Sequence, residues 1–399
     1  MAQLTNVWFI AAAWMLLAFI ASVLSIRTGV SVALLEIAMG VIAGNVLRIH
    51  TTDWINFLAT FGAGLLTFLA GAEIDPQSLR LHLRAAIVIG VVSFLVPFLA
   101  AWGFAYWLVG WTYHGSLICG IALSTTSVAV VYAVMVETGL SSTSIGKLIL
   151  AGCFVTDFGT VLALGVFFAD FNRWLILFVA VLAVVLRFLP QLVRSVITTF
   201  GASRVSEPEV KFLFLVLFFL GGLATTARSE AVLPAYLVGL VVAGVFLQDR
   251  VLVTRMRSIA FTMLTPFYFI KAGLYVSLPA IVTSAGLIVL LLGVKLGAKF
   301  VGVWPVARHF RLSQREANYT TLLMATGLTF GTISALFGLE NHLIDQTQYT
   351  VLVTVVIASA IVPTLIAQTF FQPSSASISS AGEPPAPVPA SAHARRGGS

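Results

Sequence analysis

Residues 120–139 read GIALSTTSVAVVYAVMVETG, and residues 147–165 read KLILAGCFVTDFGTVLALG. Both stretches are apolar enough to form membrane helices. Clustered hydroxyl groups within an apolar helix indicate a place where the backbone leaves helical geometry beside a cavity. The first stretch holds four of them: Ser124, Thr125, Thr126 and Ser127. We therefore predict a broken helix here. Alternatively, these hydroxyls bond to their own helix.

The second stretch carries one carboxylate, Asp157, about halfway along its length. A carboxylate near the middle of a membrane is unfavourable by roughly 3 kcal/mol on insertion scales, so such residues are usually functional. Together with the neighbouring break, Asp157 predicts a site for a cation or a proton near the membrane midplane. The alternative is a paired carboxylate with a structural role.

The composition places both stretches in a polytopic membrane protein. Of the 399 residues, 59% are hydrophobic and only 9% are charged, whereas soluble domains are about 25% charged. The net charge of +7 does not predict nucleic-acid binding, because the basic residues are dispersed among loops. Cys119 and Cys153 lie in apolar stretches and are expected to be free thiols. No catalytic triad, metal cluster or phosphate loop is visible, so we expect neither an enzyme nor a cofactor.

About twenty apolar residues are needed for each span, which predicts an all-α integral membrane protein with about thirteen transmembrane helices. A transmembrane domain is expected over 1–371 and a disordered cytoplasmic tail over 372–399. The predicted spans are 7–26, 29–48, 54–74, 85–109, 115–138, 145–169, 174–198, 211–227, 231–248, 259–278, 280–307, 315–337 and 348–371.

The loop charges predict the orientation, because cytoplasmic loops of membrane proteins are enriched in Lys and Arg. With the N-terminus outside, the outer loops hold only Arg48, Arg173 and Arg228. The C-terminus is then cytoplasmic. The basic residues of the inner loops are Arg27, Arg80, Arg84, Lys147, Arg194, Arg204, Lys211, Arg250, Arg255, Arg257, Arg308, Arg311 and Arg315.

The twelfth predicted helix repeats the pattern of the fifth. Its sequence, QREANYTTLLMATGLTFGTISALFG, is interrupted by Gly327, Thr329 and Gly331. Corresponding interruptions in two halves of a transporter indicate the binding site. Helices one to six would match helices eight to thirteen, and we expect two inverted six-helix repeats. The alternative for the twelfth helix is ordinary close packing through small residues.

Four further charged residues fall within predicted spans: Glu36, Lys271, Lys295 and Lys299. An ammonium at this depth must be paired, neutral or directed toward the interface. Lys295 and Lys299 share one helical face, and we favour Lys299 over Lys295 as the functional lysine, which could pair with Asp157. For Lys271, a snorkelling side chain and a transport role are both open. Glu36 is expected to be structural or to lie at a dimer face.

Four motifs resemble those of a known family. They are GAGLLTFLAGAEID (62–75), ALSTTSVAVV (122–131), PFYFIKAG (266–273) and KFVGVWPVAR (299–308). In their order and spacing, they resemble motifs of the monovalent cation–proton antiporters, in the branch that contains bacterial sodium/proton antiporters and Kef-type potassium-efflux systems. The likeness covers about residues 10–370.

The resemblance implies an inverted-repeat fold in which the fifth and twelfth helices cross at their broken segments. It also implies a mobile core, an elevator-type movement and a homodimer in the bacterial inner membrane. It implies that Asp157 binds both the cation and the proton. Hydroxyl ligands would come from Thr126, Ser127 and the neighbouring Thr156. It further implies that Lys299 is the lysine of the core helix.

Three departures from the family pattern shape the expected activity. Relatives often have a polar or acidic pair where this chain has Thr156-Asp157, so a single carboxylate favours one-for-one, electroneutral exchange. Relatives often carry Glu where this chain has Thr329. Kef-type proteins continue into a regulatory domain, for which the residues after 371 are too few.

We therefore predict an antiporter that exchanges a monovalent cation, Na⁺ in the first instance, for H⁺, with membrane lipid around it. A K⁺/H⁺ antiporter of the same fold is the nearest alternative, and the sequence does not separate Na⁺, K⁺ and Li⁺. A sodium-coupled symporter of an organic anion, with Lys271 facing the anion, is a second alternative.

Overall fold

The computed structural model describes residues 6–28, 30–72, 83–140, 143–168, 172–200, 207–227 and 232–373, and these are helical or lie in short connections. The protein is all-α in these ranges, as predicted. Ten helices in the described ranges are long and apolar enough to cross a membrane, and Val32–Asn45 and Val232–Leu247 are shorter apolar helices. Features expected at Asp75, Arg80, Arg204, Arg228 and 374–399 lie outside the described residues.

Each predicted span coincides with a helix, or with two helices that follow one another. The helices are α1 Val7–Thr28, α2 Val32–Asn45, α3 Asp53–Ala72, α5 Leu83–Gly103, α6 Tyr113–Ser124, α7 Val128–Glu137, α8 Ser144–Phe167, α9 Arg173–Phe200, α10 Pro208–Thr226, α11 Val232–Gln248, α12 Arg250–Ile259, α13 Thr265–Leu274, α14 Leu278–Thr283, α15 Ala285–His309, α16 Gln314–Met324, α17 Thr329–Glu340 and α18 Gln346–Ile366. Short π-helical segments follow α5, α12 and α18.

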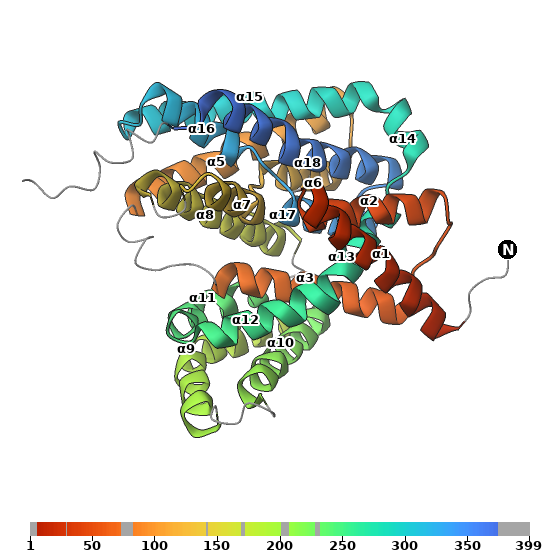
Figure 1. Ribbon diagram of the computed structural model, residues 1–399, viewed down its shortest axis with the longest axis vertical. Helices are drawn as coiled ribbons and strands as arrows, with labels where there is room; N and C mark the ends of the chain where they lie inside the picture. The colour runs from red at the N-terminus through yellow and green to blue at the C-terminus, as the bar shows by residue number, and fades with distance from the viewer. Residues whose placement is uncertain are drawn as a thin grey trace, which may run out of the picture.

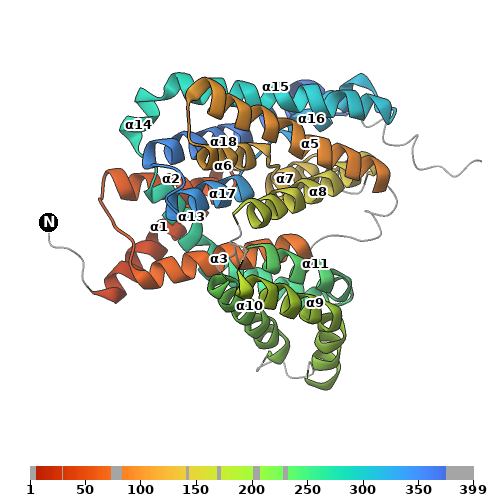
Figure 2. The same cartoon turned by 180° about the vertical axis from the view of Figure 1, so that it is seen from behind.

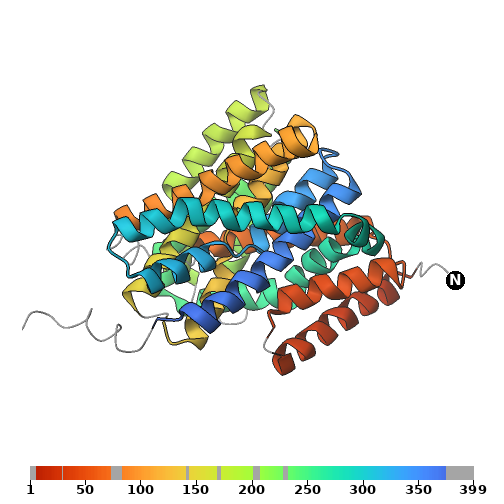
Figure 3. The same ribbon diagram turned by 90° about the horizontal axis from the view of Figure 1, so that it is seen from above.

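The helices form two groups (Figure 1). We call α5–α8 with α14–α18 the broken-helix group, and α1–α3 with α9–α13 the α3 group. Viewed from either side, α9 and α10 lie on one side of α3 while α5, α15 and α18 lie on the other (Figure 2). Seen from above, α15 runs across the molecule as a long cyan helix (Figure 3). Within the described residues, α8 and α11 make contact between the two groups.

Glycine allows two pairs of helices in the α3 group to approach very closely. Between α3 and α11, a Cβ on Gly71 would meet the Tyr236 carbonyl, and one on Gly239 would meet the Phe68 carbonyl. Between α2 and α13, a Cβ on Gly40 would meet the Ile270 carbonyl, and one on Gly273 would meet the Ile37 carbonyl. Membrane helices associate through close packing of this kind, because lipid provides little hydrophobic driving force between them.

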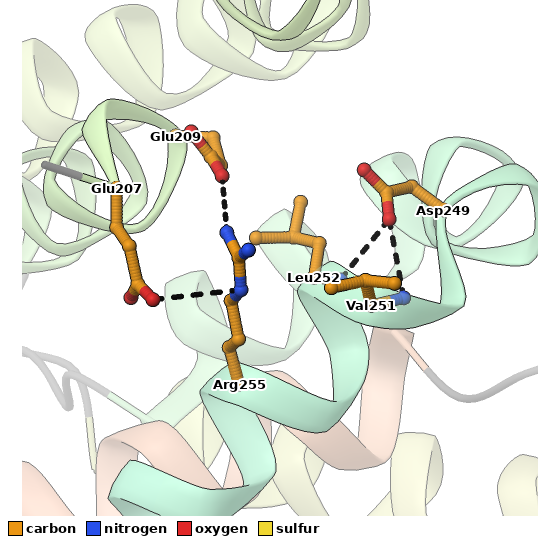
Figure 4. Close-up of polar contacts among 6 residues, drawn as sticks. All are labelled: Glu207, Glu209, Asp249, Val251, Leu252 and Arg255. Carbon is orange, nitrogen blue, oxygen red and sulfur yellow. Dashed lines mark hydrogen bonds and ion pairs between the residues drawn. The ribbon is translucent and has the colours of Figure 1, made fainter. Parts of the chain in front are cut away.

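The region around Arg255 differs from the sequence prediction, which placed it in a loop before a span beginning at residue 259. It is helical from Arg250 onward, and Asp249 caps α12 by accepting from the Val251 and Leu252 N–H groups at 3.1 Å each (Figure 4). Arg255 also donates to Glu209 at 2.8 Å and lies 3.5 Å from Glu207. The cap and these ion pairs offset the low hydrophobicity that made the segment look like a loop.

Pro190 lies inside α9, which continues from Arg173 to Phe200. Proline within a membrane helix is tolerated where neighbouring groups satisfy the freed backbone carbonyl. The predicted free thiols are confirmed, since Cys119 and Cys153 are both unpaired and buried.

Candidate functional site

Asp157 lies in the interior of the protein, on the buried face of α8. The helix begins after Thr143, whose side chain accepts from the Gly146 N–H at 3.1 Å. Asp157 is only 1% exposed, and its Oδ1 atom is buried without a hydrogen-bond partner in the described structure. Buried polar atoms in folded proteins are nearly always partnered, so an unpaired carboxylate oxygen at this depth is unusual. A proton or a cation bound at this oxygen would satisfy it.

Both predicted helix breaks are present. The first broken helix stops at Ser124 and restarts at Val128, and Thr125 has extended backbone geometry (φ −61°, ψ 154°). The second broken helix stops at Met324 and restarts at the half-buried Thr329. Breaks of this kind expose helix ends, whose partial charges attract ions and polar groups.

The two breaks lie directly against each other. The Ser127 N–H donates to the Thr326 carbonyl at 3.1 Å, and the Thr126 hydroxyl donates to the Met324 carbonyl at 2.8 Å. Backbone groups freed by one break are therefore satisfied by the other. Gly331 makes the approach tighter, since a Cβ there would meet the Ala122 carbonyl at 3.0 Å.

Three hydroxyls of the first break and of α8 donate to carbonyls of their own helix. Ser124 donates to the Ile121 carbonyl at 2.8 Å, Thr125 to the Ala122 carbonyl at 3.0 Å, and Thr156 to the Gly152 carbonyl at 2.9 Å. The Ser127 hydroxyl accepts from the Val130 N–H at 3.4 Å. In the described structure, no hydrogen bond joins any of these hydroxyls to Asp157. The donor hydrogens of Ser124, Thr125 and Thr156 are therefore occupied, and oxygen lone pairs remain for a ligand.

Lys299 is held at the C-terminal end of α6. Its ammonium donates to the Ser124 carbonyl at 2.9 Å, to Ser93 Oγ at 2.8 Å and to Thr126 Oγ1 at 3.2 Å. A positive charge at a helix C-terminus complements the helix dipole. Three acceptors match the three hydrogens of the ammonium group, so the lysine is fully satisfied at this position.

The possible pairing of Lys299 with Asp157 is not present in the structure. No ion pair within 4.0 Å joins the two groups among the described residues, although they are close enough for their charges to interact. The physical reason is that the α6 end already supplies the acceptors for the lysine. Ser93, which takes part in this arrangement, was not among the predicted site residues. The signal was available: Ser93 is a polar residue within the apolar helix α5.

Lys295 occupies the other break. Its ammonium is fully buried and donates to Ser359 Oγ of α18 at 3.0 Å. A Cβ on Gly327 would collide with this ammonium and would lie 3.1 Å from Thr125 Oγ1. Gly327 therefore leaves room for the lysine head group where it now lies. Lys299 thus contacts the first break and Lys295 contacts the second. Lys299 is the one that interacts electrostatically with Asp157.

Through Tyr236 of α11, the α3 group contacts α8 close to Asp157. Its hydroxyl donates to the Phe154 carbonyl on α8 at 3.1 Å, and it is close enough to Asp157 for an electrostatic interaction. Its ring also contacts Phe330, with 6.4 Å between the ring centroids. Asp157 therefore lies beside the contact between the two helix groups. No sequence pattern pointed to Tyr236, because its position depends on how α11 packs against α8.

Discontinuous helices close to a buried carboxylate are typical of secondary transporters. A sequence model of the family described as "Sodium/hydrogen exchanger, transmembrane" matches residues 15–372. The chain belongs to this family, and the expected membership of the cation–proton antiporters is confirmed. Among the described residues, no three His, Cys, Asp or Glu side chains are grouped as a metal site would require.

Relatives and one solved structure agree with this assignment. The probable Na⁺/H⁺ antiporter 3 of Methanocaldococcus jannaschii is 22% identical over 86% of this chain and 89% of its own length. The Na⁺/H⁺-K⁺ antiporter GerN of Bacillus cereus is 21% identical over 87% of this chain and 92% of its own. The structure of the sodium proton antiporter MjNhaP1 from M. jannaschii matches with a TM-score of 0.69 at 14% identity, covering 90% of this chain and 95% of that one. This structural likeness supports the fold.

Proposed function

We propose that the protein exchanges Na⁺ for H⁺ and that Asp157 is the shared binding site for both ions. The observation that carries this proposal is the buried, unpartnered Oδ1 atom of Asp157 beside the two helix breaks. A proton and a partly dehydrated sodium ion each neutralise this carboxylate, and neither can bind while the other is present. Competition for one carboxylate couples the two fluxes without a second site.

Oxygen ligands for the cation come from the surrounding breaks. A hard monovalent cation takes carboxylate, hydroxyl and carbonyl oxygens. Thr126, Ser127 and Thr156 have lone pairs available, and their hydroxyls are held in place by the bonds described above. A small local movement that brings these oxygens toward Asp157 completes the shell when the ion arrives.

The exchange is proposed to be one-for-one and electroneutral. Position 156 holds a threonine, so it adds no second titrating carboxylate. Its hydroxyl donates to the Gly152 carbonyl. Lys299 is satisfied at the α6 end and does not need Asp157 as its counter-ion. One proton therefore replaces one cation on a single group.

Alternating access is proposed to come from an elevator-type movement of the broken-helix group against the α3 group. The site belongs mostly to the broken-helix group and lies beside its contact with Tyr236. Moving this group as a unit carries Asp157 from one face of the membrane to the other. We further propose that the α3 group forms the dimer contact. The proposed orientation has the N-terminus outside and the C-terminus in the cytoplasm.

A K⁺/H⁺ exchange is the second candidate, supported by the name of the GerN relative, which includes both Na⁺ and K⁺. The organic-anion symporter is less well supported. It needs an unpaired cationic residue facing a cavity, and Lys271 is paired with Glu340.

The test uses purified protein in liposomes with an interior pH dye. Na⁺, K⁺ and Li⁺ are added in turn, with and without a voltage clamp that does not itself depend on potassium. We expect a cation-dependent pH change that Asp157→Asn abolishes and that the clamp does not alter. The matched control is Glu36→Gln, which removes another buried carboxylate with an unpartnered oxygen but lies outside the site. Full exchange by Asp157→Asn would contradict the proposal.

A further inference from the structure

Lys271 makes an ion pair that joins the two helix groups. It lies in α13 of the α3 group, and its side chain is only 3% exposed. Its partner is Glu340, the last residue of α17 in the broken-helix group, whose side chain is 41% exposed. By contrast, the ion pairs that Arg255 forms with Glu207 and Glu209 stay within the α3 group.

The pair lies beside a cavity between the same two groups. The cavity has a volume of about 110 Å³ and is partly open to the outside of the protein. Helices α3, α11 and α13 line one wall and α17 lines the other, with Val232 and Ile333 on opposite sides. A relative movement of the two groups would change the width of this cavity directly.

An aromatic contact lies next to the cavity-lining residues on the two helices that lead from the cavity toward α8. Tyr236 is one helical turn beyond Val232 on α11, and Phe330 is one turn before Ile333 on α17. Their rings lie 6.4 Å apart at an angle of 75°. The Tyr236 hydroxyl is already bonded to α8 close to Asp157. Along α17 the order is therefore Glu340, the cavity-lining residues and Phe330, and Phe330 contacts Tyr236, which is bonded to α8 three residues from Asp157.

We propose that Lys271 and Glu340 form a latch between the two helix groups. They are positioning residues that hold α17 against α13 and so keep the cavity from widening into a path to Asp157. Separating α13 from α17 breaks the pair. Glu340 is half-exposed and can be hydrated, whereas Lys271 is almost fully buried and loses its counter-ion. Leaving a buried charge unpaired is strongly unfavourable, so the latch opens only when water enters the cavity with it.

The role of the latch in transport rests on the proposed exchange function. The test of the latch itself measures access to the cavity and does not depend on that function. A cysteine at position 232 reports how open the cavity is, since Val232 is 7% exposed. The protein, with Cys119→Ala and Cys153→Ala as background, is reconstituted in nanodiscs so that both faces are accessible. The rate of labelling by a membrane-impermeant maleimide is then measured.

We expect Lys271→Met and Glu340→Gln each to raise the labelling rate about fivefold, which corresponds to about 1 kcal/mol in the opening equilibrium. The charge-swapped double variant, Lys271→Glu with Glu340→Lys, should return the rate to the starting value. Glu209→Gln is the matched control, since it breaks an ion pair inside the α3 group and should leave the rate unchanged.

Two outcomes would overturn the latch. Equal labelling of all variants would mean that the pair does not control the cavity. A rise that the charge swap fails to reverse would mean that the substitutions loosen the helices generally. Glu340→Gln alone keeps the test decisive if Lys271→Met does not fold, because Glu340 lies at the surface. If exchange is absent while labelling follows the expected pattern, the proposed function fails and the latch stands.

Discussion

Thr126 and Met324 are separated by 198 positions in the chain, yet the Thr126 hydroxyl donates to the Met324 carbonyl at 2.8 Å. Met324 is the last residue of α16, so this carbonyl is one that the break leaves without a helical donor. The same hydroxyl oxygen accepts from Lys299 at 3.2 Å. One side chain thus connects both broken helices and the buried lysine.

Removing this hydroxyl is expected to weaken the site. Thr126→Val keeps the shape of the side chain but leaves the Met324 carbonyl unpaired and takes one acceptor from Lys299. A buried group left without its partner is unfavourable by about 1–3 kcal/mol. We expect a lower thermal unfolding temperature in detergent and slower exchange in liposomes. Thr126→Ser, which retains the hydroxyl, should stay close to the unmodified protein. Equal behaviour of the two variants would argue against the hydrogen bond as the cause.

The two buried lysines are expected to differ in what they affect. Lys299→Met removes the charge at the α6 end and the electrostatic interaction with Asp157, so the apparent Na⁺ affinity should change together with stability. Lys295→Met removes the bond to Ser359 and should lower stability with a smaller change in Na⁺ affinity. The measurement is the Na⁺ dependence of exchange, alongside thermal unfolding. If Lys295→Met shifted the Na⁺ dependence more than Lys299→Met, Lys295 would be the functional lysine.

Gly327→Ala is expected to destabilise the second break. The added Cβ would collide with the Lys295 ammonium and come within 3.1 Å of Thr125 Oγ1 and 3.2 Å of Ser359 Oγ, so the ammonium would have to move away from its bond to Ser359. Forcing an extra methyl group into a packed interior is unfavourable by about 1–3 kcal/mol. Gly293→Ala in α15 is the control, since no atom lies within 4 Å of the added Cβ there. The unfolding temperatures of the two variants are compared, and similar values would show that the break tolerates a larger residue.

Tyr236→Phe is expected to keep the exchange activity. The substitution removes only the hydrogen bond to the Phe154 carbonyl, and a typical bond of this kind contributes about 0.5–1.5 kcal/mol. The ring contact with Phe330 remains. The exchange rate should therefore change by about tenfold at most, far less than in Asp157→Asn. Complete loss of exchange, measured in the same liposomes, would mean that the hydroxyl takes part directly in ion binding.

Much of the fold could be predicted from the sequence. Membrane spans depend on length and hydrophobicity alone, and both helix breaks were visible as Ser, Thr and Gly interrupting apolar runs. Asp157 stood out because carboxylates are rare within apolar membrane helices and usually serve a function there. These features are local in the sequence, so they can be recognised without knowing which helices pack together.

The partners of these residues could not be predicted in the same way. Lys299 contacts Ser93 and Thr126, which come from different helices, and Lys295 contacts Ser359 from a third. Lys271 left two interpretations open until its partner Glu340 was placed beside it. In each case the chemistry depends on which helix faces which, and this is set by packing over the whole molecule. The α12 helix was missed for a related reason, since its cap and ion pairs offset its polarity.

The attachment of Lys299 to the α6 end has a consequence for energy use in the cell. Because this ammonium is held by Ser93 and the α6 end, within the broken-helix group, and not by Asp157, its charge stays with that group whether a proton or a sodium ion is loaded. Under one-for-one exchange, both loaded forms then carry the same net charge across the membrane. The membrane voltage does no work on such a cycle. Sodium extrusion would draw on the pH gradient alone, and the exchanger would keep running in a cell whose membrane potential has collapsed.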